Sequence, residues 1–274
     1  MTAPLVLFAR NLAGLPGVRH GFSTRVANDP ASAEPFDLRL RPEHPARSQR
    51  MRERFLEAVG LEGAALVTLG QTHEDRIYDV ADDRPLPTEP PQGFDAVVTA
   101  RADVAVAIGT ADCLPILLAD VHGRAVGAVH AGWRSAALGL PALTVRRLID
   151  GFDVKTRELR AALGPSIGSC CFEVGEEVVE GLAARIPEPA QWVVRAPGRK
   201  PHVDLARACT LALIEAGLAP EAIECVPGCT RCDARRFFSF RREGAATGRQ
   251  LAVVGLGCGG SATSPLASAS STSA

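Results

Sequence analysis

The chain has 274 residues, of which 46% are hydrophobic and 22% charged, and its formal net charge is −1. This composition is typical of a globular protein, and it gives no general attraction to nucleic acid or to an anionic membrane, so neither is expected as a partner. The eight cysteines, together with an N-terminus that lacks the pattern of a secretory leader, predict reduced thiols and a cytoplasmic protein.

The first part of the chain predicts a loop followed by an amphipathic helix. Residues 28–46 are rich in Pro, Asp, Glu and Ala, which favours a loop. Residues 47–59 carry apolar side chains at helical spacing, and Gly60 is a typical helix end. The stripe expected to face the core consists of Met51, Phe55, Leu56 and Val59.

The middle of the chain predicts a succession of strands. Short runs of Val, Ile, Leu and Ala alternate with turns rich in Pro, Gly and Asp. The expected strands are 65–72, 76–81, 94–99, 103–108, 114–119 and 124–130. Because few helices separate these runs, the pattern argues against a doubly wound parallel sheet and favours a single α+β domain.

The remainder predicts more helices than strands. A helix is expected over 135–149, where Pro141 either bends it or marks its true first turn. The other expected helices are 176–186 and a helix from an Asp204 cap to about 217, and the expected strands are 237–241 and 251–254. The Ser-, Ala- and Thr-rich residues 259–274 are expected to be disordered, which leaves 1–258 as one catalytic domain.

His73, Cys113 and His130 share one context, since each follows or interrupts an apolar, strand-like run. A His/Cys/His set can hold a catalytic zinc ion and leave a fourth position for water or substrate. Zinc in such a set polarises a substrate atom and lowers the pKa of bound water. On residue pattern alone, a hydrogen-bonded core histidine beside an inert Cys113 remains an equal alternative.

Two further cysteine interpretations stay open. In a cysteine hydrolase, Cys113 would be the nucleophile and either histidine its base, with the backbone of 164–168 as an oxyanion cradle. Separately, Cys225, Cys229 and Cys232 could begin a structural zinc site. The usual second pair is missing from that group, so we favour ordinary buried thiols there.

Several motifs occur in a characteristic order. They are Gln71-Thr-His73, Thr110-Ala-Asp-Cys113, Val129-His-Ala-Gly-Trp-Arg134, Gly164-Pro-Ser-Ile-Gly168 with Cys171-Phe-Glu-Val-Gly175, and Cys229-Thr with Phe237-Phe-Ser-Phe-Arg-Arg242. From about His20 to Gln250 the chain resembles the polyphenol-oxidase/laccase-domain family, the YfiH/YlmD-like proteins now regarded as purine nucleoside phosphorylases.

The resemblance implies a fold and an activity. The fold would be a single α+β domain in which mixed β-sheets pack face to face with helices on the outside. One Zn²⁺ would be held by the catalytic residues His73, Cys113 and His130. The activity would be phosphorolysis of adenosine, inosine, guanosine and methylthioadenosine, with adenosine deamination at the same site. The partners would be purine nucleosides and phosphate, bound by a monomer or homodimer.

The expected substrate-binding residues are Arg25, Gln71, Asp112, Arg134 and Ser166. Arg25 and Arg134 are assigned to phosphate, because a guanidinium stays charged and pairs with phosphate oxygens in a bidentate way. The alternative is that each arginine merely pairs with a nearby carboxylate. A zinc protein that binds a nucleoside without turning it over is the alternative of a different class.

Two departures bear on the family's substrates and on its laccase label. Residues 28–40 lack the glycine-rich loop and the Leu-Asn-Leu sequence common in the family, which leaves that loop's role in substrate binding open. A multicopper oxidase commonly uses His-x-His pairs, but the six histidines here include none, and the methionines are Met1 and Met51 alone. A copper-dependent polyphenol oxidase is therefore the weaker alternative, although copper can replace zinc in a His/Cys/His set.

Overall fold

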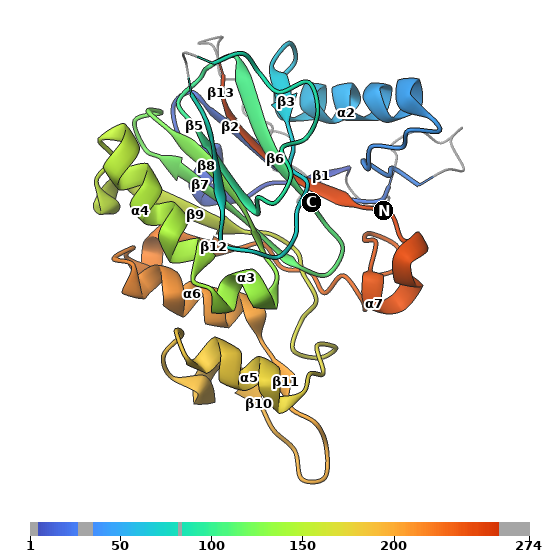
Figure 1. The fold of residues 1–274 in the computed structure, drawn as a ribbon, viewed down its shortest axis with the longest axis vertical. Helices are drawn as coiled ribbons and strands as arrows, with labels where there is room; N and C mark the ends of the chain where they lie inside the picture. Colours follow the sequence, from blue (N-terminus) through green and yellow to red (C-terminus); the bar gives the residue numbers. More distant parts are fainter. Residues whose placement is uncertain (1–4, 27–34, 82–83, 258–274) are drawn as a thin grey trace, which may run out of the picture.

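The computed structural model describes residues 5–26, 35–81 and 84–257. The expected tail 259–274, and residues 28–34 of the expected N-terminal loop, lie outside these ranges. Figure 1 shows two β-sheets between helix α2 on one side and helix α4 on the other. The expectation of an α+β fold with mixed sheets packed face to face and outer helices is confirmed.

In the described part of the chain the first sheet has five strands, in the order β1-β2-β13-β6-β3. Neighbours are antiparallel except β3, which is parallel to β6. The strands are β1 (Val6–Leu7), β2 (Val18–Ser23), β3 (Ala65–Val67), β6 (Val104–Thr110) and β13 (Gln250–Leu256).

The second sheet has six strands among the described residues, in the order β12-β9-β7-β8-β5-β4. The edge strands β12 and β4 run parallel to their neighbours, and the inner pairs are antiparallel. The strands are β4 (Ile77–Val80), β5 (Ala96–Thr99), β7 (Leu114–Asp120), β8 (Val126–Ala131), β9 (Leu159–Leu163) and β12 (Ile223–Cys225). The chain passes from the first sheet to the second twice, between β3 and β4 and between β6 and β7.

Three apolar clusters hold the layers together. Side chains such as Phe22 and Ile108 from the first sheet meet Leu117 and Val126 from the second, which fills the space between the sheets. The outer face of the first sheet packs against α2 (Pro45–Val59), and that of the second against α3 (Trp133–Ala137), α4 (Leu140–Phe152) and α6 (Leu205–Glu215). Burying these faces is the main favourable contribution to folding.

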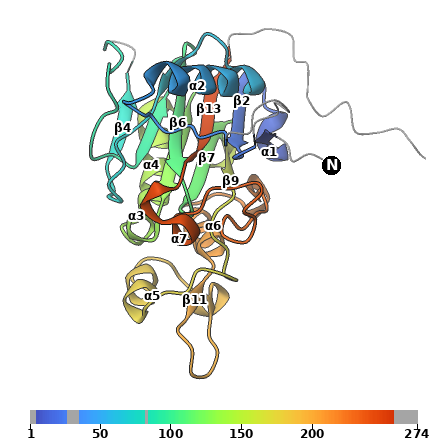
Figure 2. The ribbon, with the colours of Figure 1, turned by 90° about the vertical axis from the view of Figure 1, so that its right-hand side faces the viewer.

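An extension lies at one end of the body (Figures 1 and 2). It consists of α5 (Glu176–Ala183) and a two-stranded hairpin of β10 (Val193–Val194) and β11 (His202–Val203). Two short α-helices, α1 (Arg10–Ala13) and α7 (Phe240–Glu243), and four 3₁₀ turns complete the described elements. Within the described residues no helix is both long and apolar enough to cross a membrane.

Most expected elements are present, with bounds that differ by a few residues. α2 ends where Gly60 takes a left-handed conformation, and Met51 packs against the core as expected. Asp204 caps α6 by accepting the backbone N–H of Arg207. The strand expected over 65–72 is shorter, because after Val67 the chain leaves the β6 ladder.

One expectation is confirmed in part and another was wrong. The helix expected over 135–149 is divided into α3 and α4, because Gly139 between them has a φ of +86°, and Pro141 stands in the first turn of α4, which is the second of the two alternatives for this proline. The strand over 237–241 is instead an irregular segment leading into α7. There the backbone of Phe238 bonds to the side chain of Gln250, and Ser239 caps α7 by accepting the N–H of Arg242.

Candidate metal centre

The three proposed zinc ligands converge at one end of the sheets. Antiparallel pairing of β7 with β8 sets Leu114 opposite Ala131, so Cys113 lies beside the end of β8 that carries His130. His73 comes from the turn that follows β3, and its Nε2 lies 3.7 Å from the Cys113 Sγ. The ligand atoms of His73, Cys113 and His130 all lie within 4.8 Å of one another. The group can therefore hold a metal ion.

The backbone on both sides of this group is unusual. His73 has a φ of 65° and Asp112, next to Cys113, has a φ of 88°. Residues with a β-carbon rarely adopt left-handed conformations, and such strain tends to occur at functional sites. The neighbouring Gln71 holds both turns, because its amide group donates to the Gly109 carbonyl (2.9 Å) and accepts the Gly109 N–H (2.8 Å).

A fully buried carboxylate, Asp95, connects the supports of both histidines. One oxygen lies 2.7 Å from Nδ1 of His130, and the other accepts the backbone N–H groups of Thr72 (3.0 Å) and Glu74 (2.8 Å), on either side of His73. A carboxylate on Nδ1 fixes the ring and leaves Nε2 for a ligand, as in carboxylate–histidine–zinc groups. Asp95 was not among the residues predicted from the sequence, since only the pairing of β5 with β8 places it beside His130.

The same contacts shift the ionisation of the site. Burial opposes ionisation of Cys113, but the charge and hydrogen bonds of His130 and His73 outweigh it and lower the pKa of the thiol to about 6. Burial also opposes the charged form of His130, yet Cys113 and Asp95 raise the pKa of its imidazole to about 9. The pair therefore favours a thiolate beside an imidazolium, whose proton a metal ion would displace.

Close packing leaves no room for a β-carbon at Gly132, which precedes α3. An added β-carbon there would lie 2.7 Å from Cδ2 of His73 and 3.3 Å from Sγ of Cys113. Glycine is required here for close approach rather than for its conformation, since its φ is −68°.

The Asp112 carboxylate accepts three hydrogen bonds from the C-terminal part of the chain. The donors are the hydroxyls of Thr230 (2.6 Å) and Ser239 (3.0 Å) and the backbone N–H of Arg241 (2.6 Å). Ser166 is buried, and its backbone pairs with Gly228 and Thr230. Both residues thus lie beside the candidate centre, and their binding to substrate stays a prediction.

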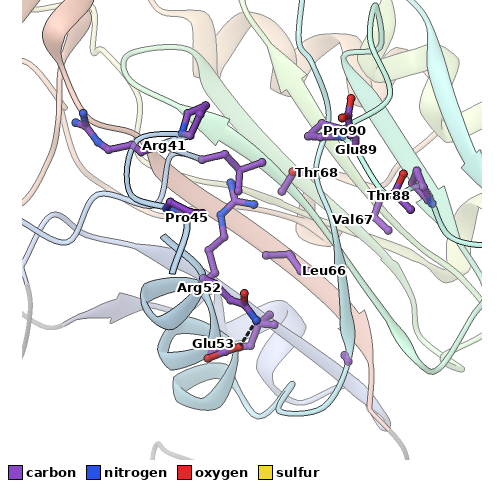
Figure 3. Close-up of a pocket in the computed structure, with 16 residues that line it drawn as sticks. Arg41, Pro45, Arg52, Glu53, Leu66, Val67, Thr68, Thr88, Glu89 and Pro90 are labelled. Carbon is purple, nitrogen blue, oxygen red and sulfur yellow. Dashed lines mark hydrogen bonds between the residues drawn. The ribbon is translucent and has the colours of Figure 1, made fainter. Parts of the chain in front are cut away.

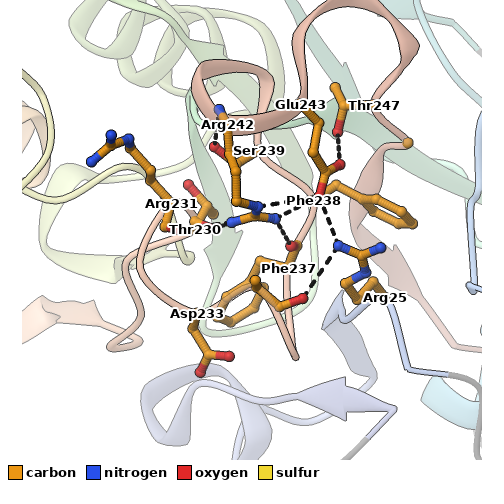
Figure 4. A network of polar contacts seen from close by, with 12 residues as sticks. Arg25, Thr230, Arg231, Asp233, Phe237, Phe238, Ser239, Arg242, Glu243 and Thr247 are labelled. Atoms are coloured by element: carbon orange, nitrogen blue, oxygen red, sulfur yellow. Dashed lines mark hydrogen bonds and ion pairs between the residues drawn. The ribbon is translucent and has the colours of Figure 1, made fainter.

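The two arginines assigned to phosphate have different surroundings. Arg25 donates to Glu243 (2.8 Å) and to the Ala234 carbonyl, within a network around Arg242 (Figure 4). Arg134 is exposed and stacks on Trp133, with 4.4 Å between its guanidinium and the ring centre. Among the residues that the structure describes, Arg134 has no carboxylate partner. The alternative of carboxylate pairing therefore applies to Arg25 and not to Arg134.

A second group of side chains with the atoms to hold a metal ion lies nearby, and it differs from the set that the sequence suggested. Cys170, Cys171, Cys229 and Cys232 have sulfur atoms within 4.8 Å of one another. Cys225 is outside this group, with its Sγ 3.8 Å from the hydroxyl of Thr210. The adjacent pair Cys170-Cys171 was a visible signal, but its proximity to Cys229 and Cys232 depends on how two distant loops meet.

A cavity of about 580 Å³ lies between α2, β3 and the segment 87–90 (Figure 3). Burial of Arg52 on its wall lowers the pKa of that guanidinium to about 10, and Arg52 donates to the Leu38 carbonyl. None of the lining residues is a ligand of the candidate centre.

Comparison with known proteins places the chain in a family. Residues 19–257 match the family model described as "Multi-copper polyphenol oxidoreductase laccase". The chain belongs to this family. The resemblance inferred from the motifs is thereby confirmed.

Members of the family similar to this chain include enzymes of purine metabolism. A Deinococcus radiodurans protein named purine nucleoside phosphorylase is 35% identical over 265 residues, which cover 93% of this chain and 95% of that one. A protein from an unknown prokaryotic organism, named adenosine deaminase RL5, is 38% identical over 159 residues, 58% of this chain and 60% of its own length. The crystal structure of the Bacillus licheniformis hypothetical protein YfiH matches with a TM-score of 0.82 at 28% identity, over 93% of this chain and 97% of that one.

Proposed function

We propose that the chain is a zinc-dependent purine nucleoside phosphorylase that acts on adenosine, inosine, guanosine and methylthioadenosine, and that deaminates adenosine at the same site. The observation that carries the proposal is the convergence of His73, Cys113 and His130 with Asp95 behind them. The names of the relatives supply the reaction.

The donor set fits zinc. Zinc bonds of about 2.0–2.3 Å to nitrogen and sulfur place tetrahedral ligand atoms about 3.3–3.8 Å apart, and Cys113 Sγ lies 3.7 Å from His73 Nε2. Three protein ligands leave a fourth position open, which is typical of catalytic rather than structural zinc. The six histidines include no His-x-His pair, so the residues fit one zinc ion better than a multicopper centre.

The residues of the chain divide the work around that ion. When bound, zinc would act as a Lewis acid toward the nucleoside or a water molecule. Asp95 holds the proton of His130 at Nδ1 and keeps Nε2 free for the metal. Gln71 fixes the turn that carries His73. Asp112 fixes the segment 230–241 next to Cys113 through its three hydrogen bonds.

Phosphorolysis also requires a cation for the nucleophile, which attacks the sugar C1′ as the purine leaves. We assign this role first to Arg134, because it is exposed beside the Gly132 contact with the metal ligands and has no carboxylate partner in the described part of the chain. Arg25 is the second candidate, since Glu243 already neutralises it. Bidentate pairing with phosphate is a general property of arginine.

A cysteine hydrolase is the second candidate function. The lowered pKa of Cys113, about 6, and the short distance to His73 are the features of an activated nucleophile. The two functions differ in their response to metal. Bound zinc would be coordinated by the Cys113 thiolate and so inhibit a cysteine hydrolase, whereas the phosphorylase requires bound zinc.

The test is a nucleoside panel assayed by chromatography with and without phosphate. The wild type and the Cys113→Ala variant are compared, with zinc measured in the same samples. We expect the wild type to release hypoxanthine from inosine only with phosphate, and Cys113→Ala to lose the zinc ion of this centre together with turnover. Zinc-loaded wild type that binds nucleosides without turnover would support a binding protein instead. Hydrolytic activity that rises on chelation would support the cysteine hydrolase.

A further inference from the structure

Four cysteines from two loops far apart in the sequence meet beside the candidate catalytic centre. Cys170 and Cys171 follow the 164–168 loop, and Cys229 and Cys232 form a Cys-x-x-Cys pair in the segment after β12. The sulfur of Cys232 lies 3.2 Å from that of Cys171 and 3.6 Å from that of Cys170. The described cysteines, these four included, are free thiols.

The spacing of the sulfur atoms suits one tetrahedral metal ion. Zinc–sulfur bonds of about 2.3 Å place the four sulfur atoms of a tetrathiolate about 3.8 Å apart. All four sulfur atoms lie within 4.8 Å of one another, so small rotations of the side chains bring them to that distance. A Cys-x-x-Cys pair joined by two more cysteines is a common donor set for structural zinc.

The surroundings compensate for the negative charge of thiolates. The backbone N–H of Gly168 donates to the Cys229 sulfur (3.3 Å), and the guanidinium of Arg231 donates to the Cys171 sulfur (3.5 Å). A tetrathiolate with zinc carries a net charge of −2, which these donors reduce. Cys170 and Cys232 are exposed, so the ion can enter from solvent.

We propose that Cys170, Cys171, Cys229 and Cys232 bind a second zinc ion, separate from the one proposed for His73, Cys113 and His130. Binding releases the protons of the thiols and requires no oxidant. With four protein ligands the site is closed, and its role is structural. This four-cysteine site goes beyond the proposed function, because it shares no ligand with the catalytic centre.

The second ion would join two loops that position the catalytic centre. The backbones of these loops already pair, since Thr230 donates its N–H to the Ser166 carbonyl (3.0 Å). The loop of Ser166 also holds the turn before Cys113, through the N–H of Ile167 on the Asp112 carbonyl (2.9 Å). From the other side, Arg242 donates to the carbonyls of Thr230 and Arg231 (Figure 4). A metal crosslink at the cysteines would complete this support.

The test is zinc stoichiometry of the full chain, purified under reducing conditions and measured by elemental mass spectrometry. We expect two zinc ions in the wild type, because two groups of candidate ligands are present. Cys113→Ala should bind one zinc ion, and so should the double variant Cys229→Ser, Cys232→Ser. Cys225→Ser is the matched control, since it removes an exposed cysteine outside the group. It should keep both ions.

X-ray absorption at the zinc edge of Cys113→Ala gives a readout that needs no change in the four-cysteine group. It should show zinc surrounded by sulfur alone, at about 2.3 Å. The proposal is overturned if Cys113→Ala retains no zinc, if its zinc has nitrogen ligands, or if the double cysteine variant keeps the wild-type stoichiometry. A disulfide between Cys171 and Cys232, found by peptide mapping of the unreduced protein, would overturn it as well. None of these results depends on nucleoside turnover, so the proposed function is tested separately.

Discussion

The Asp95 side chain supports two histidines, His130 on β8 and His73 in the turn after β3. Its carboxylate contacts the His130 ring on one oxygen and the turn around His73 on the other. Burial opposes the charged form of Asp95, but the hydrogen bond to His130 and the N–H groups of Glu74 and Thr72 lower its pKa to about 2. The group is therefore a permanent anion at neutral pH, suited to orient a ligand.

Replacing Asp95 with asparagine should weaken zinc binding roughly 10- to 100-fold, the usual effect of removing a partner of a ligating histidine. Asparagine offers one acceptor oxygen in place of two, so its NH₂ group would face either the His130 Nδ1 or the N–H groups of Thr72 and Glu74, where a carboxylate oxygen now accepts. Chelator competition measures the affinity. Asp79→Asn, which removes a carboxylate on β4 that pairs with Arg147, is the control. Equal zinc affinity in both variants would contradict this role of Asp95.

Gly132→Ala tests the close packing of the ligands. The new methyl group would meet His73 at 2.7 Å, so the ring must move. Overpacking of this kind costs about 1–3 kcal/mol, and we expect zinc affinity to fall roughly 10- to 100-fold by the same arithmetic. Gly181→Ala on α5 is the matched control, because its nearest neighbour would lie at an ordinary 3.6 Å. Unchanged zinc affinity in Gly132→Ala would show that His73 is not a ligand.

Arg134→Ala separates the phosphate role from the metal. Loss of a charged hydrogen bond is worth about 1.5–3 kcal/mol, so the apparent KM for phosphate should rise roughly 10- to 100-fold while bound zinc and adenosine deamination are kept. Arg146→Ala, which removes an exposed arginine on α4, serves as the control. A parallel loss of phosphorolysis and deamination would assign Arg134 to the fold or the metal centre instead.

At the scale of elements, the seam between β2 and α1 contains a buried histidine. His20 on β2 is 2% exposed, and its Nε2 accepts the backbone N–H of Ala9, the residue before α1. Burial lowers the pKa of His20 from 6.5 to about 4. Protonation would remove the lone pair that Ala9 uses, so the folded protein keeps this ring neutral.

The consequence is a pH dependence of stability with a definite sign. Between pH 6.5 and about 4 the unfolded chain binds a proton at His20 that the folded chain does not, so stability falls as the pH decreases through that window. The full effect is roughly 3 kcal/mol. Denaturant unfolding at pH 7 and pH 4 measures it. Between pH 7 and pH 4 the free energy of unfolding of His20→Gln should fall by roughly 3 kcal/mol less than that of the wild type. His122→Gln, which removes an exposed ring, should follow the wild type. Parallel curves for all three would contradict the prediction.

Local patterns predicted most elements but not the contacts between them. Apolar runs such as 114–119 and 124–130 became β7 and β8 because both faces of the second sheet are covered. The error at 237–241 has a physical cause: Phe237 and Phe238 suit a strand, but their backbone is held by Gln250 rather than by a neighbouring strand. Such a side-chain contact has no periodic signal.

The candidate centre was predictable only in part for the same reason. His73, Cys113 and His130 could be grouped from their shared place at strand ends. Asp95 could not, since its role depends on the register of β5 with β8. Cys225 was grouped with Cys229 by proximity in sequence, whereas folding replaces it with Cys170 and Cys171.

At the scale of the whole molecule, the site lies where the connections between the two sheets meet. The turn from β6 to β7 carries Cys113, β8 carries His130, and the turn after β3 carries His73. The C-terminal segment 229–242 closes over the Asp112 side of this group before β13 returns to the first sheet (Figure 2). Because both sheets are anchored by buried apolar clusters, the ligands sit on a rigid frame.

We propose that zinc at His73, Cys113 and His130 makes the chain a nucleoside phosphorylase. The most direct measurement starts from chelator-treated protein, adds Zn²⁺ in steps, and records release of hypoxanthine from inosine with and without phosphate. We expect the phosphate-dependent rate to rise in proportion to zinc bound at these ligands, and Cys113→Ala to stay inactive at every step. A phosphate-dependent rate that is the same without zinc, or zinc-loaded protein that releases no hypoxanthine, would contradict it.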